Sequence, residues 1–213
     1  MNADLATVSR NRLAETITGG LSLTAKMPCP SWGISATRCK LGSILAQTPG
    51  STCSACYALK GRYRFAAVQR KLEERYRGLF DPRWTPAMVH LVRWYCDRYF
   101  RWFDSGDLQG ENHLRNIVTI AEHTPDVRHW LPSREAAVVR TVEDERGAFP
   151  PNLTVRLSGP MIDGKAPRWP TTSVVSTGGA EGYRCPSRAQ GNACGACRAC
   201  WDQEVRQVVY TLH

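Results

Sequence analysis

The sequence predicts an α/β fold in which a partial, half-barrel-like and mostly parallel sheet carries helices on its outside. The first observation behind this prediction is the alternation of strand-like and amphipathic helical segments between residues 100 and 177, which is typical of parallel sheets with crossover helices. The second is that eight of the nine cysteines fall into two groups near opposite ends of the chain. Cysteine-rich loops are therefore predicted at both ends of the core.

A single domain is expected for residues 1–213, because this length matches one domain and allows a sizeable core. Within it we distinguish a cysteine-rich N-terminal loop region (1–56), a strand-helix core (57–180) and a cysteine-rich C-terminal segment (181–213). A metal in such a chain is expected to serve function or to clasp the two ends, since the core can supply folding energy without it.

The first quarter of the chain is predicted to contain little regular structure. Residues 1–28 are expected to be mostly irregular, with a turn at Gly19-Gly20, and a loop rich in Pro, Gly and Ser follows up to residue 52. A loop of this length usually wraps around something, which a metal cluster or a zinc ion would provide.

Helical periodicity begins after this loop. Residues 57–79 are predicted to form a helix whose apolar positions, among them Phe65 and Leu72, recur at helical spacing. A second helix is predicted to begin near Thr85-Pro86, a cap followed by a proline in the first turn. Cys96 falls on the apolar stripe of this second helix and is interpreted as a small core residue rather than as a ligand.

Strands and helices alternate in the rest of the core. Strands are predicted at residues 100–103, 127–131, 153–157 and 173–177, and helices around residues 114–121 and up to about residue 146. Small or ionisable side chains follow the four strands: Asp104, Ser105, Asp107, Ser133, Arg134, Glu135, Ser158, Ser176 and Thr177. Ligands bind at the carboxyl ends of parallel strands, so these side chains predict a substrate site, although caps and turns are the competing explanation. The candidate catalytic residues, which would contact substrate or move protons, are Asp104, Asp107, Arg134 and Glu135.

The cysteine spacing predicts bound metal. The C-terminal pattern C-x8-C-x2-C-x2-C is closer to the thiolate runs that hold iron-sulfur clusters than to the paired knuckles of structural zinc. It is formed by Cys185, Cys194, Cys197 and Cys200. The N-terminal group has one C-x2-C knuckle and fits either metal; it consists of Cys29, Cys39, Cys53 and Cys56. We expect one or two 4Fe-4S clusters, with zinc as the alternative.

The net charge of the chain indicates its binding partners, and its N-terminal residues indicate its cellular location. The formal charge is +9, which favours association with nucleic acid or other anions. The densest positive stretch is predicted to form one helix face, although a solvated face is the competing explanation; it comprises Arg62, Arg64, Arg70, Lys71, Arg75 and Arg77. No signal peptide or membrane-length apolar span is found, so a cytoplasmic protein without membrane association is expected. A reducing cytoplasm also favours metal over disulfides.

Several motifs across the chain are distinctive: Met27-Pro28-Cys29-Pro30, the CSACYA run at 53–58, FRWFDSGD at 100–107, Trp130 to Glu135, and Cys194 to Trp201. Together they resemble the phage "gene product 88" family, a resemblance that implies a phage or prophage origin and no particular reaction. If the chain is phage-encoded, its expected location is the cytoplasm of the host cell.

A second resemblance is to proteins related to radical-SAM enzymes, carried by the Cys-Tyr-Ala element and the polar strand ends. It implies a half-barrel with a 4Fe-4S cluster near the strand ends. The C-x3-C-x2-C motif of those enzymes is absent at 29–56 and at 185–200, so the resemblance extends to the half-barrel and a cluster, not to use of S-adenosylmethionine.

Two functions follow from these patterns. The first is an iron-sulfur enzyme of redox or radical type, with a pocket at the strand ends and a nucleotide or nucleic acid as substrate. The alternative is a non-catalytic module in which zinc stiffens a basic surface that binds nucleic acid. The kind of metal bound to the purified protein distinguishes the two.

Overall fold

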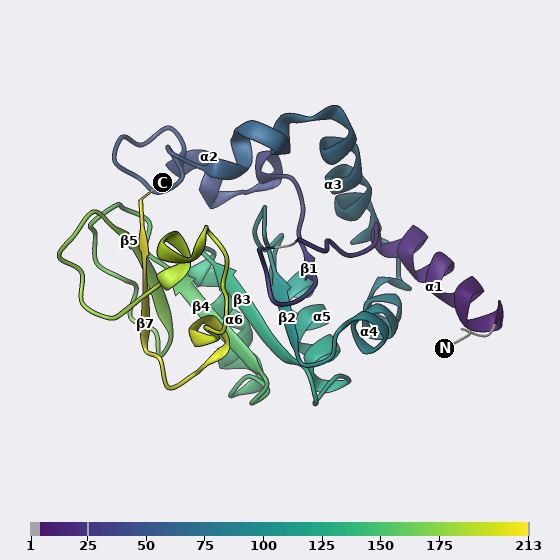
Figure 1. Ribbon diagram of the computed structural model, residues 1–213. Helices are drawn as coiled ribbons and strands as arrows, with labels where there is room; N and C mark the ends of the chain where they lie inside the picture. Colours follow the sequence, from purple (N-terminus) through teal and green to yellow (C-terminus); the bar gives the residue numbers. More distant parts are fainter. Residues whose placement is uncertain (1–4, 25, 213) are drawn as a thin grey trace.

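A computed structural model describes residues 5–24 and 26–212, and its centre is an open sheet in which every strand pair is parallel (Figure 1). The order across the sheet is β1-β2-β3-β4-β5-β7-β6. The strands are β1 (Ser31–Trp32), β2 (Tyr99–Trp102), β3 (Arg128–Ser133), β4 (Leu153–Ser158), β5 (Thr172–Ser176), β6 (Tyr183–Arg184) and β7 (Gln207–Thr211). The predicted α/β class and parallel sheet are confirmed.

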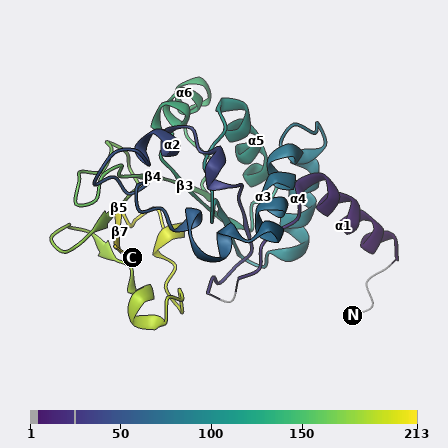
Figure 2. The same cartoon turned by 90° about the horizontal axis from the view of Figure 1, so that it is seen from above.

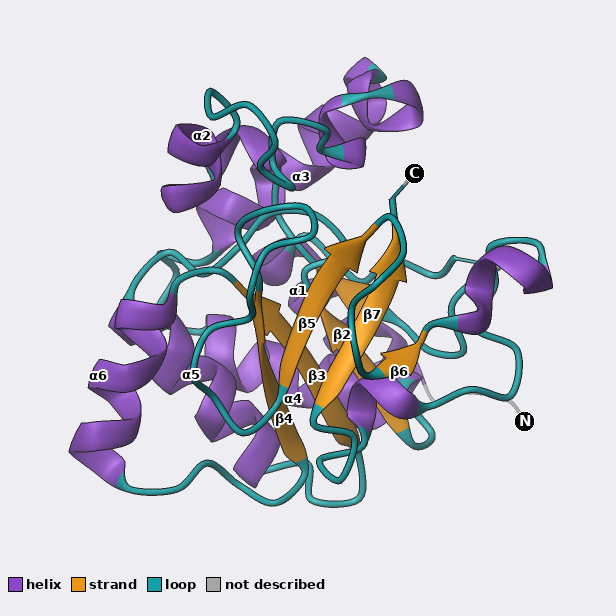
Figure 3. Ribbon diagram, turned by 90° about the vertical axis from the view of Figure 1, so that its left-hand side faces the viewer, coloured by secondary structure: helices purple, strands orange, loops and turns teal. Residues whose placement is uncertain are grey.

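The helices divide between one face of the sheet and its upper end. They are α1 (Leu5–Thr18), α2 (Leu41–Leu45), α3 (Ala66–Gly78), α4 (Trp84–Tyr95), α5 (Glu111–Glu122) and α6 (Ala136–Arg146). Helices α5 and α6 lie beside one face of the sheet, whereas α2 and its flanking loops lie above the arrowheads of the strands (Figure 3). Seen from above, α1, α3 and α4 gather at one end of the molecule, away from β5 and β7 (Figure 2). None of the described helices is long and apolar enough to cross a bilayer.

The core forms between the helices and one face of the sheet because side chains alternate along the strands. Phe100 and Trp102 of β2 and Leu131 of β3 are fully buried in this core. The intervening residues, such as Trp130, point to the opposite face, where a second and smaller apolar cluster forms. Cys96 is buried in the main core, as predicted.

The N-terminal part contains more regular structure than predicted. Residues 5–18 form α1 rather than an irregular lead-in, and α1 packs on α3 and α4. Its apolar residues are few and widely spaced, so tertiary contacts rather than periodicity stabilise it. The predicted turn is present: Gly19 and Gly20 have φ angles of 74° and 68°, which end the helix in the left-handed region.

The other differences concern short elements. The helix predicted for 57–79 begins at Ala66, because residues 57–64 form two 3₁₀ turns with Gly61 in the left-handed region. Strands β1, β6 and β7 were not predicted. Two of them have only two residues each, and such strands depend on their neighbours rather than on their own sequence.

Two buried histidines make the stability of the fold depend on pH. His129 stacks on Trp102 with ring centroids 6.2 Å apart, and His113 lies among Trp32, Trp84 and Phe103. Desolvation lowers the pKa of each histidine to about 3. The unfolded chain takes up a proton near pH 6.5 whereas the folded chain does not, so stability is lost as pH falls below about 6.5.

We therefore expect His129→Gln to weaken the pH dependence of the free energy of unfolding between pH 6 and 4. Each buried neutral histidine contributes a slope of about 1.4 kcal/mol per pH unit in this window. Urea unfolding followed by tryptophan fluorescence at several pH values measures the slope. The matched control is His123→Gln, at an exposed histidine, which keeps the wild-type slope. Equal slopes for His129→Gln and the wild type would refute the assignment.

Candidate functional site

The cysteines group differently in the folded protein than they do along the sequence. Cys29 lies in the smaller apolar cluster together with Cys200, and Cys185 and Cys197 pack against that cluster. Cys194 also belongs to this set. Its backbone N–H donates to Lys26 O at 3.0 Å, and its thiol interacts electrostatically with the thiol of Cys29. We call this set the five-cysteine group: Cys29, Cys185, Cys194, Cys197 and Cys200.

The remaining three cysteines of the two motifs form a separate set, the three-cysteine group: Cys39, Cys53 and Cys56. Gly42 lies between two of them, since a Cβ atom there would meet Cys39 Sγ at 3.5 Å and Cys53 Sγ at 3.7 Å. The backbone N–H of Cys56 donates to Cys53 O at 3.1 Å, which closes the C-x2-C turn. Burial raises the pKa of Cys39 to about 12, and Asp107, Cys56 and Cys53 act in the same direction. The three-cysteine group therefore adjoins Asp107 at the strand ends.

Asp107 and Glu135, two of the predicted catalytic residues, hold the loops around this group. The Asp107 carboxylate accepts hydrogen bonds from Ser133 Oγ at 2.6 Å and from the backbone N–H groups of Leu108 and Arg134 at 2.8 and 2.9 Å. Burial raises the pKa of Asp107, and these hydrogen bonds oppose the rise. Glu135 Oε1 accepts from the N–H of Leu41 at 2.9 Å. Asp107 thus joins the ends of β2 and β3, and Glu135 joins the end of β3 to the cysteine loop.

Asp104 and Arg134, the other two, each carry a polar atom that no described residue satisfies. Asp104 Oδ2 accepts from Tyr63 at 3.2 Å, and its carbonyl oxygen accepts from Tyr57 at 2.5 Å. Asp104 Oδ1 and Arg134 Nε are buried without a hydrogen-bond partner in the described part of the chain. The Arg134 charge opposes the rise in pKa that burial causes at Cys53. The Arg134 guanidinium therefore lies beside the three-cysteine group, whereas Asp104 Oδ1 packs against Gly33.

The serines and threonine at the later strand ends bind each other and Asp163. Ser158 Oγ and Ser173 Oγ are 3.1 Å apart. The Asp163 carboxylate accepts from Ser176 Oγ and Thr177 Oγ1, both at 2.7 Å. Asp163 was not recognised from the sequence, although its position just before a Gly is a common turn signal. These side chains shape the loops after β4 and β5.

Arg156 anchors the segment that carries the five-cysteine group. The side chain is fully buried on β4, and no described carboxylate forms an ion pair with it. Its guanidinium donates to five backbone carbonyls: Cys200 (3.4 Å), Thr172 (3.0 Å), Val205 (2.8 Å), Ala199 (3.1 Å) and Asp202 (2.9 Å). A single charged residue in the middle of a strand, LTVRLS, is the sequence signal that could have drawn attention to it.

The donor chemistry fits thiolate-bound metal, but the side chains do not form a closed coordination sphere. No set of three or more His, Cys, Asp or Glu residues in the described ranges is arranged to hold a single metal ion. A zinc ion with Zn–S bonds of about 2.3 Å requires its sulfurs to converge closely, whereas a cluster holds them farther apart. The described thiols are gathered in two groups but do not converge on one point, so they form no preformed zinc site.

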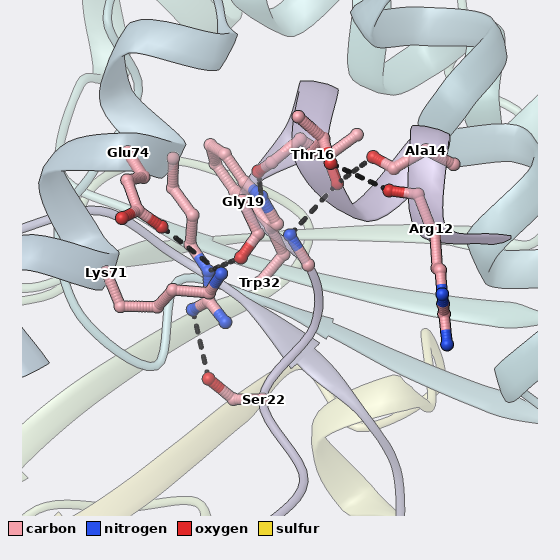
Figure 4. A network of polar contacts seen from close by, with 11 residues as sticks. Arg12, Ala14, Thr16, Gly19, Ser22, Trp32, Lys71 and Glu74 are labelled. Atoms are coloured by element: carbon pink, nitrogen blue, oxygen red, sulfur yellow. Dashed lines mark hydrogen bonds and ion pairs between the residues drawn. The ribbon is translucent and has the colours of Figure 1, made fainter.

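The positive stretch predicted as one helix face is divided by the fold. Arg62, Arg64 and Arg70 are exposed, and Lys71 is exposed in an ion pair with Glu74 at 3.2 Å. Arg75 is buried instead: it donates to Gly19 O at 3.3 Å and to Ser22 Oγ at 3.0 Å. Figure 4 shows Gly19 and Ser22 in this network beside Trp32. Arg75 thus ties α3 to the N-terminal segment and is not part of the basic surface.

A hollow of about 530 Å³ lies at the opposite end of the sheet from the three-cysteine group. Arg98, Arg128 and Asn152, which precede or begin β2, β3 and β4, contribute to its lining. Acidic residues also line it, so it has no net preference for anions. We place the candidate site at the cysteine groups, where the unsatisfied polar atoms are.

Comparison with known proteins identifies a family and no activity. The family model described as gene product 88 matches residues 1–203, a span that includes both cysteine groups. No curated protein and no solved structure matches the chain.

Replacing Arg156 with methionine is expected to destabilise the fold by more than about 2 kcal/mol, because several buried carbonyls lose their donor at once. Urea unfolding followed by fluorescence measures the change. Arg140→Met, at an exposed arginine of α6, is the matched control and is expected to stay within about 0.5 kcal/mol of the wild type. Similar stability of the two variants would contradict the anchoring role.

Proposed function

The chain belongs to the gene product 88 family, and we propose that it is an iron-sulfur protein of redox or radical type acting at the C-terminal ends of its parallel strands. The observation that carries this proposal is the division of eight cysteines into a group of three at the strand ends and a group of five against the sheet face. Such a division suits two clusters with different tasks.

The three-cysteine group is the proposed reaction centre. Three thiolates bind three irons of a 4Fe-4S cluster and leave the fourth without a protein ligand, as catalytic metal sites in general keep an open position. A cluster there would supply one-electron chemistry. Substrate would meet Asp104 Oδ1 and Arg134 Nε, the two buried polar atoms that lack a partner among the described residues.

The roles of the four polar residues then divide in two. Asp104 would accept a hydrogen bond or a proton from substrate, and Arg134 would bind an anionic group. Asp107 holds Arg134 through the backbone N–H at 2.9 Å, and Glu135 holds the loop of Cys39 through Leu41. These two are positioning residues in this proposal.

The five-cysteine group is proposed to hold the second cluster. Four thiolates complete the ligand set of a 4Fe-4S cluster, so one of the five is left over. The cluster would lie against Trp130 and Trp201 on the sheet face opposite α5 and α6. In that position it is suited to electron transfer rather than to direct contact with substrate.

The proposed substrate class is a nucleotide or nucleic acid. Lys60, Arg62 and Arg64 are exposed next to the three-cysteine group in sequence, and Phe65 beside them is 62% exposed. Basic side chains with an exposed aromatic ring are typical of surfaces that bind phosphates and stack on bases. Tyr57, which directly follows Cys56, is also exposed and joins this rim to the site.

Protein purified without oxygen is expected to be brown and to contain iron and acid-labile sulfide. Cys53→Ala/Cys56→Ala is expected to lose about half of the iron, and Cys197→Ala/Cys200→Ala the other half, because each removes ligands of one cluster. Iron and sulfide assays with absorption spectra measure this. Cys96→Ala, at a cysteine of the apolar core, is the control with wild-type iron content. Colourless wild-type protein after reconstitution would end the proposal, and stoichiometric zinc without sulfide would favour the zinc module.

That module remains the second candidate because the exposed basic residues would serve it equally well. If the surface binds single-stranded nucleic acid, neutralising three of its arginines is expected to weaken binding at least about tenfold at low salt. The slope of log K against log salt is expected to become shallower by about 2 units. The variant is Arg62→Gln/Arg64→Gln/Arg70→Gln, and fluorescence anisotropy at several salt concentrations is the measurement.

The control for this experiment removes three charges elsewhere. Arg93→Gln/Arg115→Gln/Arg140→Gln changes exposed arginines of α4, α5 and α6, and is expected to retain most of the affinity and the slope. Equal losses in both variants would show a general charge effect instead of a defined surface. Wild-type affinity that does not vary with salt would exclude this surface as a nucleic-acid interface.

A further inference from the structure

Arg101 of β2 occupies a place between the two chain segments that form the five-cysteine group. The backbone N–H of Arg101 donates at 3.1 Å to the carbonyl oxygen of Pro30, the residue that follows Cys29. The carbonyl oxygen of Phe100, the residue before Arg101, accepts at 2.8 Å from Nε1 of Trp201, the residue that follows Cys200. The two neighbours of Arg101 on its strand, Phe100 and Trp102, face the helices, so Arg101 faces the cysteines.

The Arg101 side chain extends into this group. Its Nη1 lies 3.5 Å from Met27 Sδ, and the same sulfur atom lies 3.9 Å from Cys194 Sγ. The guanidinium carbon lies 4.6 Å from the ring centroid of Trp130, which packs in the cluster that contains Cys29 and Cys200. The positive charge therefore lies beside the sulfur that touches Cys194, and it interacts electrostatically with Cys29, Cys194 and Cys200.

This charge has no carboxylate in direct contact among the described residues. No described carboxylate forms an ion pair with Arg101, its buried Nε has no hydrogen-bond partner, and its Nη2 has one long bond, to Phe103 O at 3.4 Å. Arg156, by contrast, is satisfied by carbonyls. Burial tends to lower the pKa of Arg101, but Tyr57, Asp104, Tyr210 and Cys200 raise it, so the side chain stays charged. A half-buried and poorly paired cation, with its Nε fully buried, points to an anion that it is built to face.

We propose that Arg101 raises the reduction potential of a cluster bound by the five-cysteine group. The inference rests on the proposed function and goes beyond it by assigning the setting of the potential to one side chain. A thiolate-bound cluster becomes more negative when it gains an electron, so a fixed positive charge nearby stabilises the reduced form more than the oxidised form. Arg101 lies beside the segments that carry the ligands and does not touch the reacting atoms, and is a positioning residue in this sense.

The test is a redox titration of the five-cysteine cluster alone, in the Cys53→Ala/Cys56→Ala background, followed by electron paramagnetic resonance. Arg101→Met is expected to lower the equilibrium constant for reduction at least about tenfold, which is about 59 mV for one electron. Arg101→Lys retains the charge and is expected to restore most of this loss. Arg98→Met, at an exposed arginine just before β2, is the matched control with an unchanged potential.

The possible outcomes distinguish failure of the Arg101 role from failure of the cluster proposal. Wild-type protein without iron or sulfide refutes both. Arg101→Met with the iron and sulfide content of its parent and the same potential refutes the role of Arg101 and leaves the cluster proposal standing. Should Arg101→Met fail to assemble the cluster, Arg101→Lys decides: normal iron content and a near-parental potential support the role, and loss of iron in both variants overturns it in favour of a purely structural one.

Discussion

The rest of the structure depends on how the charge of Arg156 is accommodated. A guanidinium in the middle of a central strand, without a carboxylate partner among the described residues, costs several kcal/mol unless its N–H groups are satisfied. Carbonyls between Thr172 and Val205 supply the acceptors. The C-terminal segment must therefore lie across this face of the sheet, and Thr154 and Trp201 add their own hydrogen bonds to the same arrangement. The position of the five-cysteine group follows from this constraint.

The sheet thus separates two chemical environments. The face that carries α4, α5 and α6 is apolar and rich in aromatic rings, and even its histidines are held neutral. The other face and the upper end gather thiols and positive charge, with Arg101 and Arg134 beside the two cysteine groups. This separation lets one face of the sheet form an apolar core for stability while the other face holds the thiols and the charged groups. The proposed redox function uses the second environment only.

Periodicity predicted the parts of the fold that local sequence determines. Strands β2 to β5 and helices α4 to α6 were located within a few residues, and the strand-end residue Asp107 does lie near Cys39. The sequence could not reveal that Cys29 leaves its neighbours, because that depends on a contact between Lys26 and Cys194, far apart in the chain. For the same reason Arg75 looked like part of a basic helix face, whereas the packing of α1 buries it. Spacing describes which cysteines are close in the chain, and topology decides which ones meet.

The order of the last strands has a consequence for how the molecule assembles. β7 follows β6 in the sequence but lies between β5 and β6 in the sheet. β6 therefore has no partner until β7 has docked on β5, and the intervening segment with Cys185, Cys194, Cys197 and Cys200 is a loop whose closure comes late. During synthesis this loop would stay open to solvent after the helix-covered part had folded. In that interval the thiols that become half-buried or buried once the strand is in place are accessible from solvent.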